Sequence, residues 1–149
     1  MKSIFLTTAL TIFSLTNKVV AQEISQSQIP SIIVNNFQKQ FPKAFDVEWE
    51  LKGSLYQVEY EIGVLGADHE AWYNQTGKLI RHKEEISKKD LPQKVLSSID
   101  KSFSLYRIDD VKKITETNNV TYTLELKSFT EEWKVAYDKN GKLLSKIAD

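Results

Sequence analysis

The stretch Tyr73-Asn74-Gln75-Thr76-Gly77-Lys78-Leu79-Ile80 recurs near the end of the chain as Tyr137-Asp138-Lys139-Asn140-Gly141-Lys142-Leu143-Leu144. Each copy joins an aromatic residue, a polar turn with glycine and a Lys-Leu-aliphatic segment, which is a β-hairpin signal. Asn140-Gly141 is a pair typical of a type I′ turn, in which both residues have positive φ. The two copies predict a doubled structural unit. Turn geometry and a core leucine after the turn explain the Gly-Lys-Leu that they share.

Each copy of the hairpin is preceded by a predicted amphipathic helix. The first helix opens at Ile29-Pro30, since proline fits a first helical turn, and it ends at Phe41-Pro42. The second opens at Leu91-Pro92, with Asp90 as its N-cap. Apolar residues recur at helical spacing in both segments: Ile32, Ile33, Phe37 and Phe41 in the first, Val95, Leu96, Ile99 and Phe103 in the second.

Period-two alternation after each helix predicts antiparallel strands with one buried face. In the first half they cover about 45–51, 56–62, 67–73 and 78–83. In the second half 122–126 and 133–137 alternate most clearly, whereas Ile108, Val111 and Ile114 recur every third residue, which favours a bulge or an edge strand. The sequence therefore predicts an α+β fold. It is a tandem repeat of two α-β4 units, about 29–86 and 91–147, with an antiparallel sheet and both helices packed on one face.

The first 21 residues have the features of an export signal. Lys2 supplies the positive start, residues 4–15 are mostly apolar, and Val19-Val20-Ala21 fits a small-residue cleavage site before Gln22. We therefore expect a periplasmic or secreted protein whose residues 22–149 form a single domain. We also expect no stable membrane insertion after cleavage.

The bulk composition narrows the class of partner. Loss of Lys2 and Lys18 with the signal would leave 18 basic residues of the original 20 against 20 acidic ones, a net charge of about −2. This balance provides no field that would attract nucleic acid. The chain has no cysteine, so its stability must come from burial.

These features together resemble the PepSY-like, β-lactamase-inhibitor-like periplasmic proteins of Bacteroidetes. The resemblance rests on the export signal, the first helix from Ile29-Pro30 to Phe41-Pro42, Val47-Glu48-Trp49, the Tyr-x-Val-x-Tyr strand at 56–60, and the turns at Gly77-Lys78-Leu79 and Gly141-Lys142-Leu143. It covers essentially the whole exported chain. It implies the α-β4 fold, twice, and a binding role that is inhibitory or regulatory. It implies no particular binding residue.

No pattern for catalysis or cofactor binding is present. The chain lacks cysteine, a Gly-x-Ser-x-Gly segment and a phosphate-binding glycine loop, so we expect a protein that is not an enzyme and needs no cofactor. His69 and His82 lack the spacing of a metal site. His69 aligns with Trp133 on an inward position, which favours a packed or rim histidine over a ligand.

The predicted outward face of the first unit is strongly acidic, and it gives the candidate site. It carries Trp72 and the carboxylates Asp46, Glu48, Glu50, Glu59, Glu61, Asp68 and Glu70. Like charges on neighbouring strands cost stability, so this face either invites a cation or basic partner, or is a solvated surface that prevents edge association. The glycine-bounded loop 63–66 presents Val64 and Leu65 beside it. The set predicted to bind is Trp72, Glu48, Glu59, Glu61, Glu70, Val64 and Leu65.

Two functions follow from this face. The first is a non-catalytic module that binds a protein partner, and inhibits or regulates it, through the open sheet face and loop 63–66. The second is a sensor of a small ligand or of a cation such as Ca²⁺, for which several oxygens would have to converge on one point.

Overall fold

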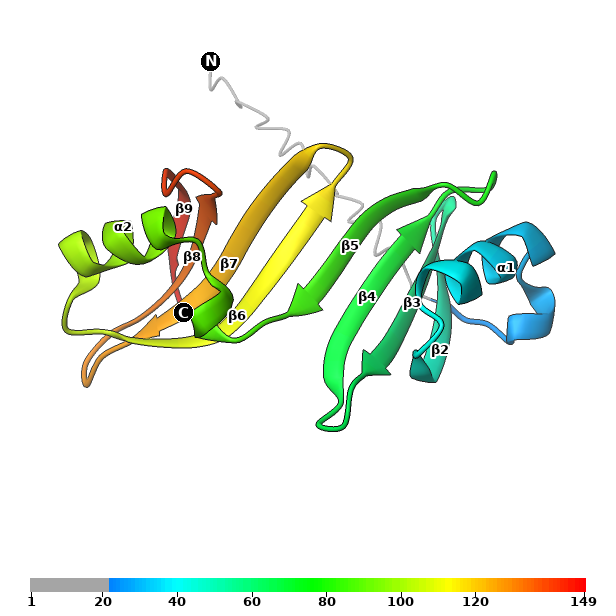
Figure 1. Cartoon of the computed structure of the whole chain (residues 1–149), viewed down its shortest axis with the longest axis horizontal. Coiled ribbons are helices and arrows are strands. Elements are labelled where there is room, and N and C mark those ends of the chain that lie inside the picture. Colours follow the sequence, from blue (N-terminus) through cyan, green and yellow to red (C-terminus); the bar gives the residue numbers. More distant parts are fainter. Residues whose placement is uncertain (1–21) are drawn as a thin grey trace, which may run out of the picture.

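The computed structural model describes residues 22–149 (Figure 1), and the predicted export signal lies outside them. The helices are α1 (Ser31–Gln40) and α2 (Gln93–Phe103), each preceded by a short 3₁₀ helix, η1 (Gln26–Gln28) and η2 (Lys88–Asp90). The strands are β1 (Gln22–Glu23), β2 (Phe45–Lys52), β3 (Leu55–Ile62), β4 (Ala67–Tyr73), β5 (Leu79–Glu85), β6 (Arg107–Glu116), β7 (Asn119–Lys127), β8 (Glu132–Asp138) and β9 (Leu143–Ala148). Within residues 22–149, no helix has the length and apolar character needed to cross a bilayer.

All nine strands form one antiparallel sheet in chain order, so every strand pairs with its neighbours along the chain. The two halves join where β5 pairs with β6, from Arg81 opposite Glu116 to Glu85 opposite Lys112. The two-residue strand β1 adds to the edge at β2. The sheet is therefore continuous, and the predicted arrangement of two α-β4 units in tandem is confirmed.

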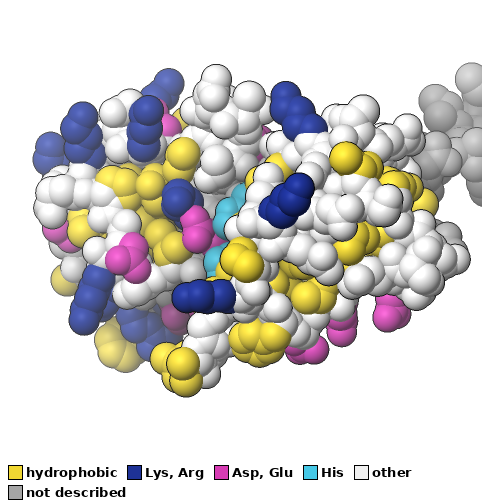
Figure 2. All heavy atoms as spheres, turned by 45° about the vertical axis from the view of Figure 1, so that its right-hand side comes forward, with side chains coloured by type: hydrophobic (Ala, Val, Ile, Leu, Met, Phe, Trp, Pro, Cys, Tyr) yellow, Lys and Arg dark blue, Asp and Glu magenta, His cyan; other side chains and the backbone are white. Residues whose placement is uncertain are grey.

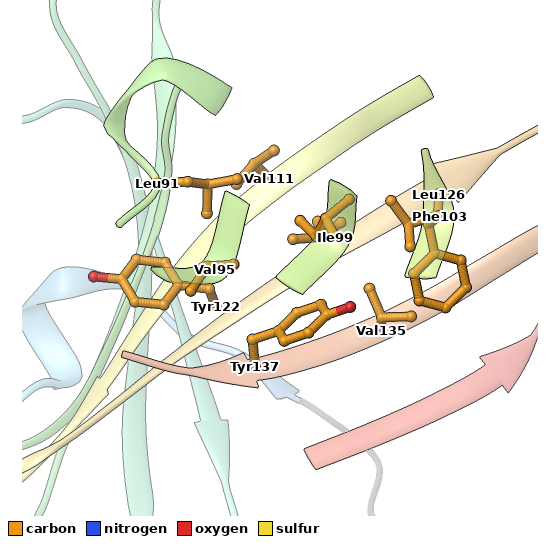
Figure 3. Packing of buried hydrophobic residues seen from close by; sticks show 10 residues of the cluster. Leu91, Val95, Ile99, Phe103, Val111, Tyr122, Leu126, Val135 and Tyr137 are labelled. Carbon is orange, nitrogen blue, oxygen red and sulfur yellow. The ribbon is translucent and has the colours of Figure 1, made fainter. Parts of the chain in front are cut away.

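Both helices cover the same face of this sheet, each over its own half (Figure 1). In the first repeat Ile33 and Phe37 of α1 pack against strand residues that include Trp49, Val58 and Tyr73. In the second, Val95, Ile99 and Phe103 of α2 pack against Leu126, Val135 and Tyr137 (Figure 3). Burying one such aliphatic side chain contributes about 1.5–3 kcal/mol. The two clusters stabilise each helix on its own four strands. No helix of residues 22–149 lies over the opposite face, which we call the uncovered face.

The repeated hairpin turns also contact the helices. Asn36 of α1 donates a side-chain hydrogen bond to the Gly77 carbonyl at 2.9 Å, and Ser98 of α2 donates one to the Gly141 carbonyl at 2.7 Å. A Cβ on Gly141 would overlap the Lys94 carbonyl. Glycine is therefore favoured in each turn for two reasons. It allows close packing against the helix, and it adopts the positive φ of 80–81° found there.

The turn type differs from the type I′ prediction at Asn140-Gly141. The Gly141 amide donates to the Asp138 carbonyl at 3.0 Å, and Asn140 is not among the residues with positive φ. The Asp138 side chain accepts from the amides of Asn140 and Lys142, which holds a longer turn closed by a left-handed glycine. Leu143, predicted to be a core leucine, is 42% exposed because β9 lies at the sheet edge.

A bulge interrupts the first full strand of both repeats. The register shifts between Asp109 and Lys112 in β6, where Asp110 has φ of 46°. This confirms the predicted bulge, but β6 lies between β5 and β7 and is not an edge strand. A matching shift follows Phe45 in β2, where the sequence predicted clean alternation, and it leaves Phe45 46% exposed. The extra residue in a bulge moves its neighbours off the expected face.

The first turns of both helices differ from the prediction. The N-cap of α2 is Pro92, and the predicted cap Asp90 instead ends η2, whose own cap Ser87 accepts from the Lys89 amide. Leu91 and Pro92 are both extended, so the helix begins only after them. On α1, Ile32 is 51% exposed although it was predicted to face the core, because Ile33 takes the fully buried position.

The packing of the second turn on α2 can be tested with two alanine substitutions at positive φ. Gly53→Ala has open space around the new Cβ, so only backbone strain of about 1 kcal/mol is expected. Gly141→Ala adds a steric overlap with the Lys94 carbonyl, and we expect a total loss of about 3 kcal/mol in the free energy of unfolding. Urea denaturation measures both. Equal losses would show that the turn does not pack closely on α2.

Candidate functional site

The acidic residues of the uncovered face form rows across the first repeat. Glu48, Glu59 and Glu70 are direct neighbours on β2, β3 and β4, and Glu61 lies opposite Asp68 in the next row. The structure thus brings four of the predicted binding residues together, Glu48, Glu59, Glu61 and Glu70. The alternation of β3 and β4 places them, since every second residue of each strand points away from the helices.

These residues line a shallow depression of about 240 Å³, the acidic hollow. Its walls are Asp46, Glu48, Glu59, Glu61, Asp68 and Glu70, together with Tyr60 and His69. Asp46 reaches it from the β2 bulge, with φ of 51°. Six carboxylates therefore share one concave surface at the end of the sheet near loop 63–66.

Few cations neutralise this surface. Among residues 22–149, Glu70 is the one carboxylate of the hollow that has an ion pair, with Lys83. Outside the hollow, Lys52 pairs with Glu50 at 2.8 Å. On the corresponding face of the second repeat, lysine side chains neutralise the acidic residues. Lys127 lies 2.7 Å from Glu125 and 3.0 Å from Glu132, and Lys134 lies 2.6 Å from Asp149. Within the described residues, the acidic cluster on the uncovered face of the first repeat therefore has fewer ion pairs than the cluster around Lys127 in the second.

A buried amide side chain adjoins Glu59, the exposed centre of the row. Gln57, only 1% exposed although it is on the uncovered face, donates from its amide to Glu59 at 2.8 Å and to Glu70 at 3.2 Å. Burial, followed by the charges of Glu70 and Glu50, raises the pKa of Glu59 above its ordinary value, and Lys52 and Lys83 oppose the change. The charged form of Glu59 therefore costs the free protein stability.

Trp72 lies on the uncovered face, as predicted, but it is half-buried. The Arg81 guanidinium lies 4.8 Å from the centre of its ring and also approaches Glu116 of β6 at 3.3 Å. This cation–π contact was not foreseen, although alternation places Arg81 directly opposite Trp72 in the next strand. A neighbour inside the protein thus covers part of the tryptophan.

Loop 63–66 presents the most exposed apolar side chains near the hollow. Val64 and Leu65 are 103% and 98% exposed, and the Gly66 amide closes the turn on the Gly63 carbonyl at 3.3 Å. The loop joins β3 to β4 directly beyond the pair Glu61 and Asp68. Two free aliphatic side chains therefore adjoin the acidic hollow.

Carboxylate oxygens of the hollow do not converge as a cation site requires. Across the described part of the chain, three acidic groups come within 4.8 Å of one another only at Glu125, Glu132 and Asp149, in the second repeat. Lys127 and Lys134 already pair with those three groups. The geometry of the first repeat suits a distributed positive surface better than a single ion.

The two histidines meet on the helix-covered face, which spacing along the chain did not reveal. His69 Nδ1 of β4 lies 3.3 Å from His82 Nε2 of β5, and the Tyr60 hydroxyl lies 3.1 Å from the same nitrogen. Both imidazoles are half-buried, and Figure 2 shows them (cyan) at the surface near the middle of the molecule. His69 is therefore a packed rim residue, as predicted. Alternation along β4 and β5 would have placed His82 on the same face.

Comparison with known proteins agrees with this architecture. A family model described as "Putative beta-lactamase-inhibitor-like, PepSY-like" matches twice, over residues 16–81 and 54–145, as a tandem repeat would. No curated protein matches the chain.

Solved structures show the same fold at low sequence identity. A BLIP-like protein from Bacteroides fragilis shares 20% identity, with a TM-score of 0.66 over 80% of this chain and 85% of that one. A structure titled "putative periplasmic proteins" from Bacteroides eggerthii shares 13%, with a TM-score of 0.69 over 80% and 88%. A DUF2874 family protein from Bacteroides uniformis shares 14%, with a TM-score of 0.68 over the same fractions. With the family model matching most of its length, the chain belongs to the PepSY-like, β-lactamase-inhibitor-like family.

Proposed function

We propose that this protein is an exported, non-catalytic binding module that holds a positively charged protein surface in the acidic hollow. The observation that carries the proposal is the row Glu48, Glu59 and Glu70, in which only Glu70 has an ion pair within the described residues. Val64 and Leu65 provide the adjoining apolar contact. Trp72, held under Arg81, is the rim of the same surface.

In the absence of a partner, the protein keeps an arrangement of charges that weakens its own fold. Like charges opposite one another on a sheet are destabilising, and desolvation at Glu59 adds to the cost. A basic partner would neutralise the carboxylates and cover the exposed aliphatic side chains in one step. The second repeat shows that this fold can place lysines among its acidic residues, as Lys127 does.

The cellular setting of the proposal is the periplasm. The sequence features of an export signal and the name of the Bacteroides eggerthii structure support it. Inhibition or regulation of the bound protein is the form of binding that the family description suggests. A calcium sensor is less well supported, since the hollow lacks three converging carboxylates.

The charge contribution can be tested by isosteric neutralisation. The triple variant Glu48→Gln, Glu59→Gln, Glu61→Gln should lose most of its affinity for a fluorescein-labelled peptide of four Lys-Gly-Leu repeats and for proteins captured from periplasmic extract. The matched control Glu23→Gln, Asp90→Asn, Asp100→Asn removes the same charge from exposed positions elsewhere. Anisotropy measures the peptide and mass spectrometry identifies the captured proteins. Equal losses in both variants would leave only a net-charge effect and contradict a defined site.

The apolar contribution needs a separate pair of variants. Val64→Ser with Leu65→Ser should weaken binding about tenfold or more without changing the melting temperature, because both side chains are fully exposed. Phe129→Ser is the control, since Phe129 is equally exposed on the corresponding loop of the second repeat. Loss of affinity in the Phe129 variant alone would move the site to the second repeat.

Glu59→Gln should separate stability from function. The substitution keeps an acceptor for Gln57 but removes the charge whose pKa is raised, so at about pH 7.5 the melting temperature should rise by about 2 °C while affinity falls. The gain should vanish at about pH 3.5, below the ordinary pKa of 4.5, because Glu59 is then protonated in folded and unfolded states alike. Thermal melts at both pH values measure it. A lower melting temperature at pH 7.5 would show that the charge stabilises the fold.

A further inference from the structure

The pair of histidines adjoins the acidic hollow through His69 alone, because His69 borders the hollow while both imidazoles lie on the helix-covered face, next to Phe41. His69, which lines the hollow, faces His82 with its Nδ1 atom 3.3 Å from Nε2, and their ring centres are 5.5 Å apart. At that separation the two nitrogens point almost directly at each other, so one donates its proton and the other accepts. The imidazoles reach the surface near the middle of the molecule (Figure 2), where solvent can exchange protons with them.

The second repeat shows what the same place in the fold does with a permanent cation. Lys146 of β9 aligns with His82, and its ammonium lies 3.6 Å from the centre of the Trp133 ring and 5.1 Å from that of Phe103. Trp133 aligns with His69. In the first repeat the His82 ring lies 5.0 Å from that of Phe41, at the end of α1. The position therefore holds a positive charge against an aromatic ring in one repeat and a titratable group in the other.

We propose that protonation of the His69–His82 pair regulates the acidic hollow, lowering its affinity for a basic partner in mild acid. The inference rests on the proposed function. A proton added to the pair places a positive charge on the other side of β4 from Asp68 and Glu70, where it opposes the field by which the carboxylates attract cationic side chains. Binding is then strong when both imidazoles are neutral and weak when the pair is charged.

The groups around the two histidines determine the pH at which the pair takes up a proton. Burial lowers the pKa of both histidines from the ordinary 6.5, opposed by Glu84 of β5 for both and by Asp68 of β4 for His69. For His82, the charges of His69 and of Lys113 on β6 lower the pKa further. Tyr60 of β3 stays neutral, and α1 contributes the uncharged Phe41 ring. Both histidines are therefore neutral at pH 7, and charging occurs below pH 6.5.

The hydrogen bond between the imidazoles makes the two protonation steps unequal. A first proton leaves an N–H donor facing a lone pair, so the contact survives with one positive charge. A second proton places two donors against each other and breaks the contact. The pair should consequently take up one proton well before the other.

The experiment combines histidine titration with binding. Proton and carbon NMR of the imidazoles from about pH 8 to about pH 4.5, with a chelator present, should show two coupled steps below pH 6.5. The labelled Lys-Gly-Leu peptide should bind wild type about fivefold more weakly at about pH 5.5 than at about pH 7.5. In His69→Gln with His82→Gln, only the smaller change due to carboxylates such as Glu59 should remain. His82→Lys, which places a permanent cation where the second repeat has Lys146, should bind weakly at both pH values.

The outcomes separate this inference from the function on which it rests. No binding of peptide or extract protein to wild type at pH 7.5 overturns the proposed function and, with it, any regulation. Binding at pH 7.5 with the same pH dependence in wild type and in the double glutamine variant overturns the regulation alone. Independent titration of the two histidines at their ordinary pKa also overturns it. Single His69→Gln, checked by a thermal melt, repeats the comparison if the double variant does not fold.

Stability provides a readout that needs no partner. Because the unfolded state binds protons at a higher pH than the folded state, wild type should lose stability as the pH falls through 6.5. The double glutamine variant should lack that loss. A wild-type melting temperature that stays level between about pH 7 and about pH 5.5, with histidine charging observed by NMR, contradicts the lowered pKa values.

Discussion

The packing of each helix on one face of the sheet is the constraint on which the rest of the structure depends. Ile33 and Phe37 in the first repeat, and Val95 and Ile99 in the second, remove one face of four strands from water. Alternation along the strands then sends every second side chain to the opposite face, over which neither α1 nor α2 lies. The acidic hollow exists because that second face is free to carry charge without disturbing the core.

The two repeats show how one scaffold separates stability from specificity. Their helices, bulges and helix-contacting turns correspond, so these features serve the fold. The repeats differ in the ion pairs of the uncovered face and in loops 63–66 and 128–131. They also differ where His69 contacts His82, since the second repeat has Trp133 and Lys146 there. In a duplicated unit, one copy can neutralise its acidic residues with lysine, as Lys127 does, while the other copy keeps exposed negative charge.

Most of the fold followed from periodicity, because helical and period-two spacing report directly on which residues are buried. The internal repeat provided two sequence segments from which each type of helix or strand could be predicted. The failures were local. The bulge in β2, the start of α2 after Pro92 and the turn held by Asp138 all depend on backbone hydrogen bonds that a pattern of apolar residues does not encode.

The candidate site was predictable only in part, for a related reason. Alternation placed Glu59, Glu61 and Glu70 on one face, but it could not show how neighbouring strands were aligned. Strand register decides that Arg81 covers Trp72, that Lys83 meets Glu70, and that His69 faces His82. Those contacts join residues on different strands, so spacing along one strand does not reveal them.

The strand order has a consequence for how the chain loosens. Each strand pairs only with its neighbours in sequence, so no strand pairing joins the first half of one repeat to the far half of the other. Among the described residues, the halves have separate hydrophobic clusters, and their strands pair at β5 and β6. Amide protons of the two clusters can therefore exchange with solvent at different rates, as in solenoid proteins, where each unit opens with a free energy of its own.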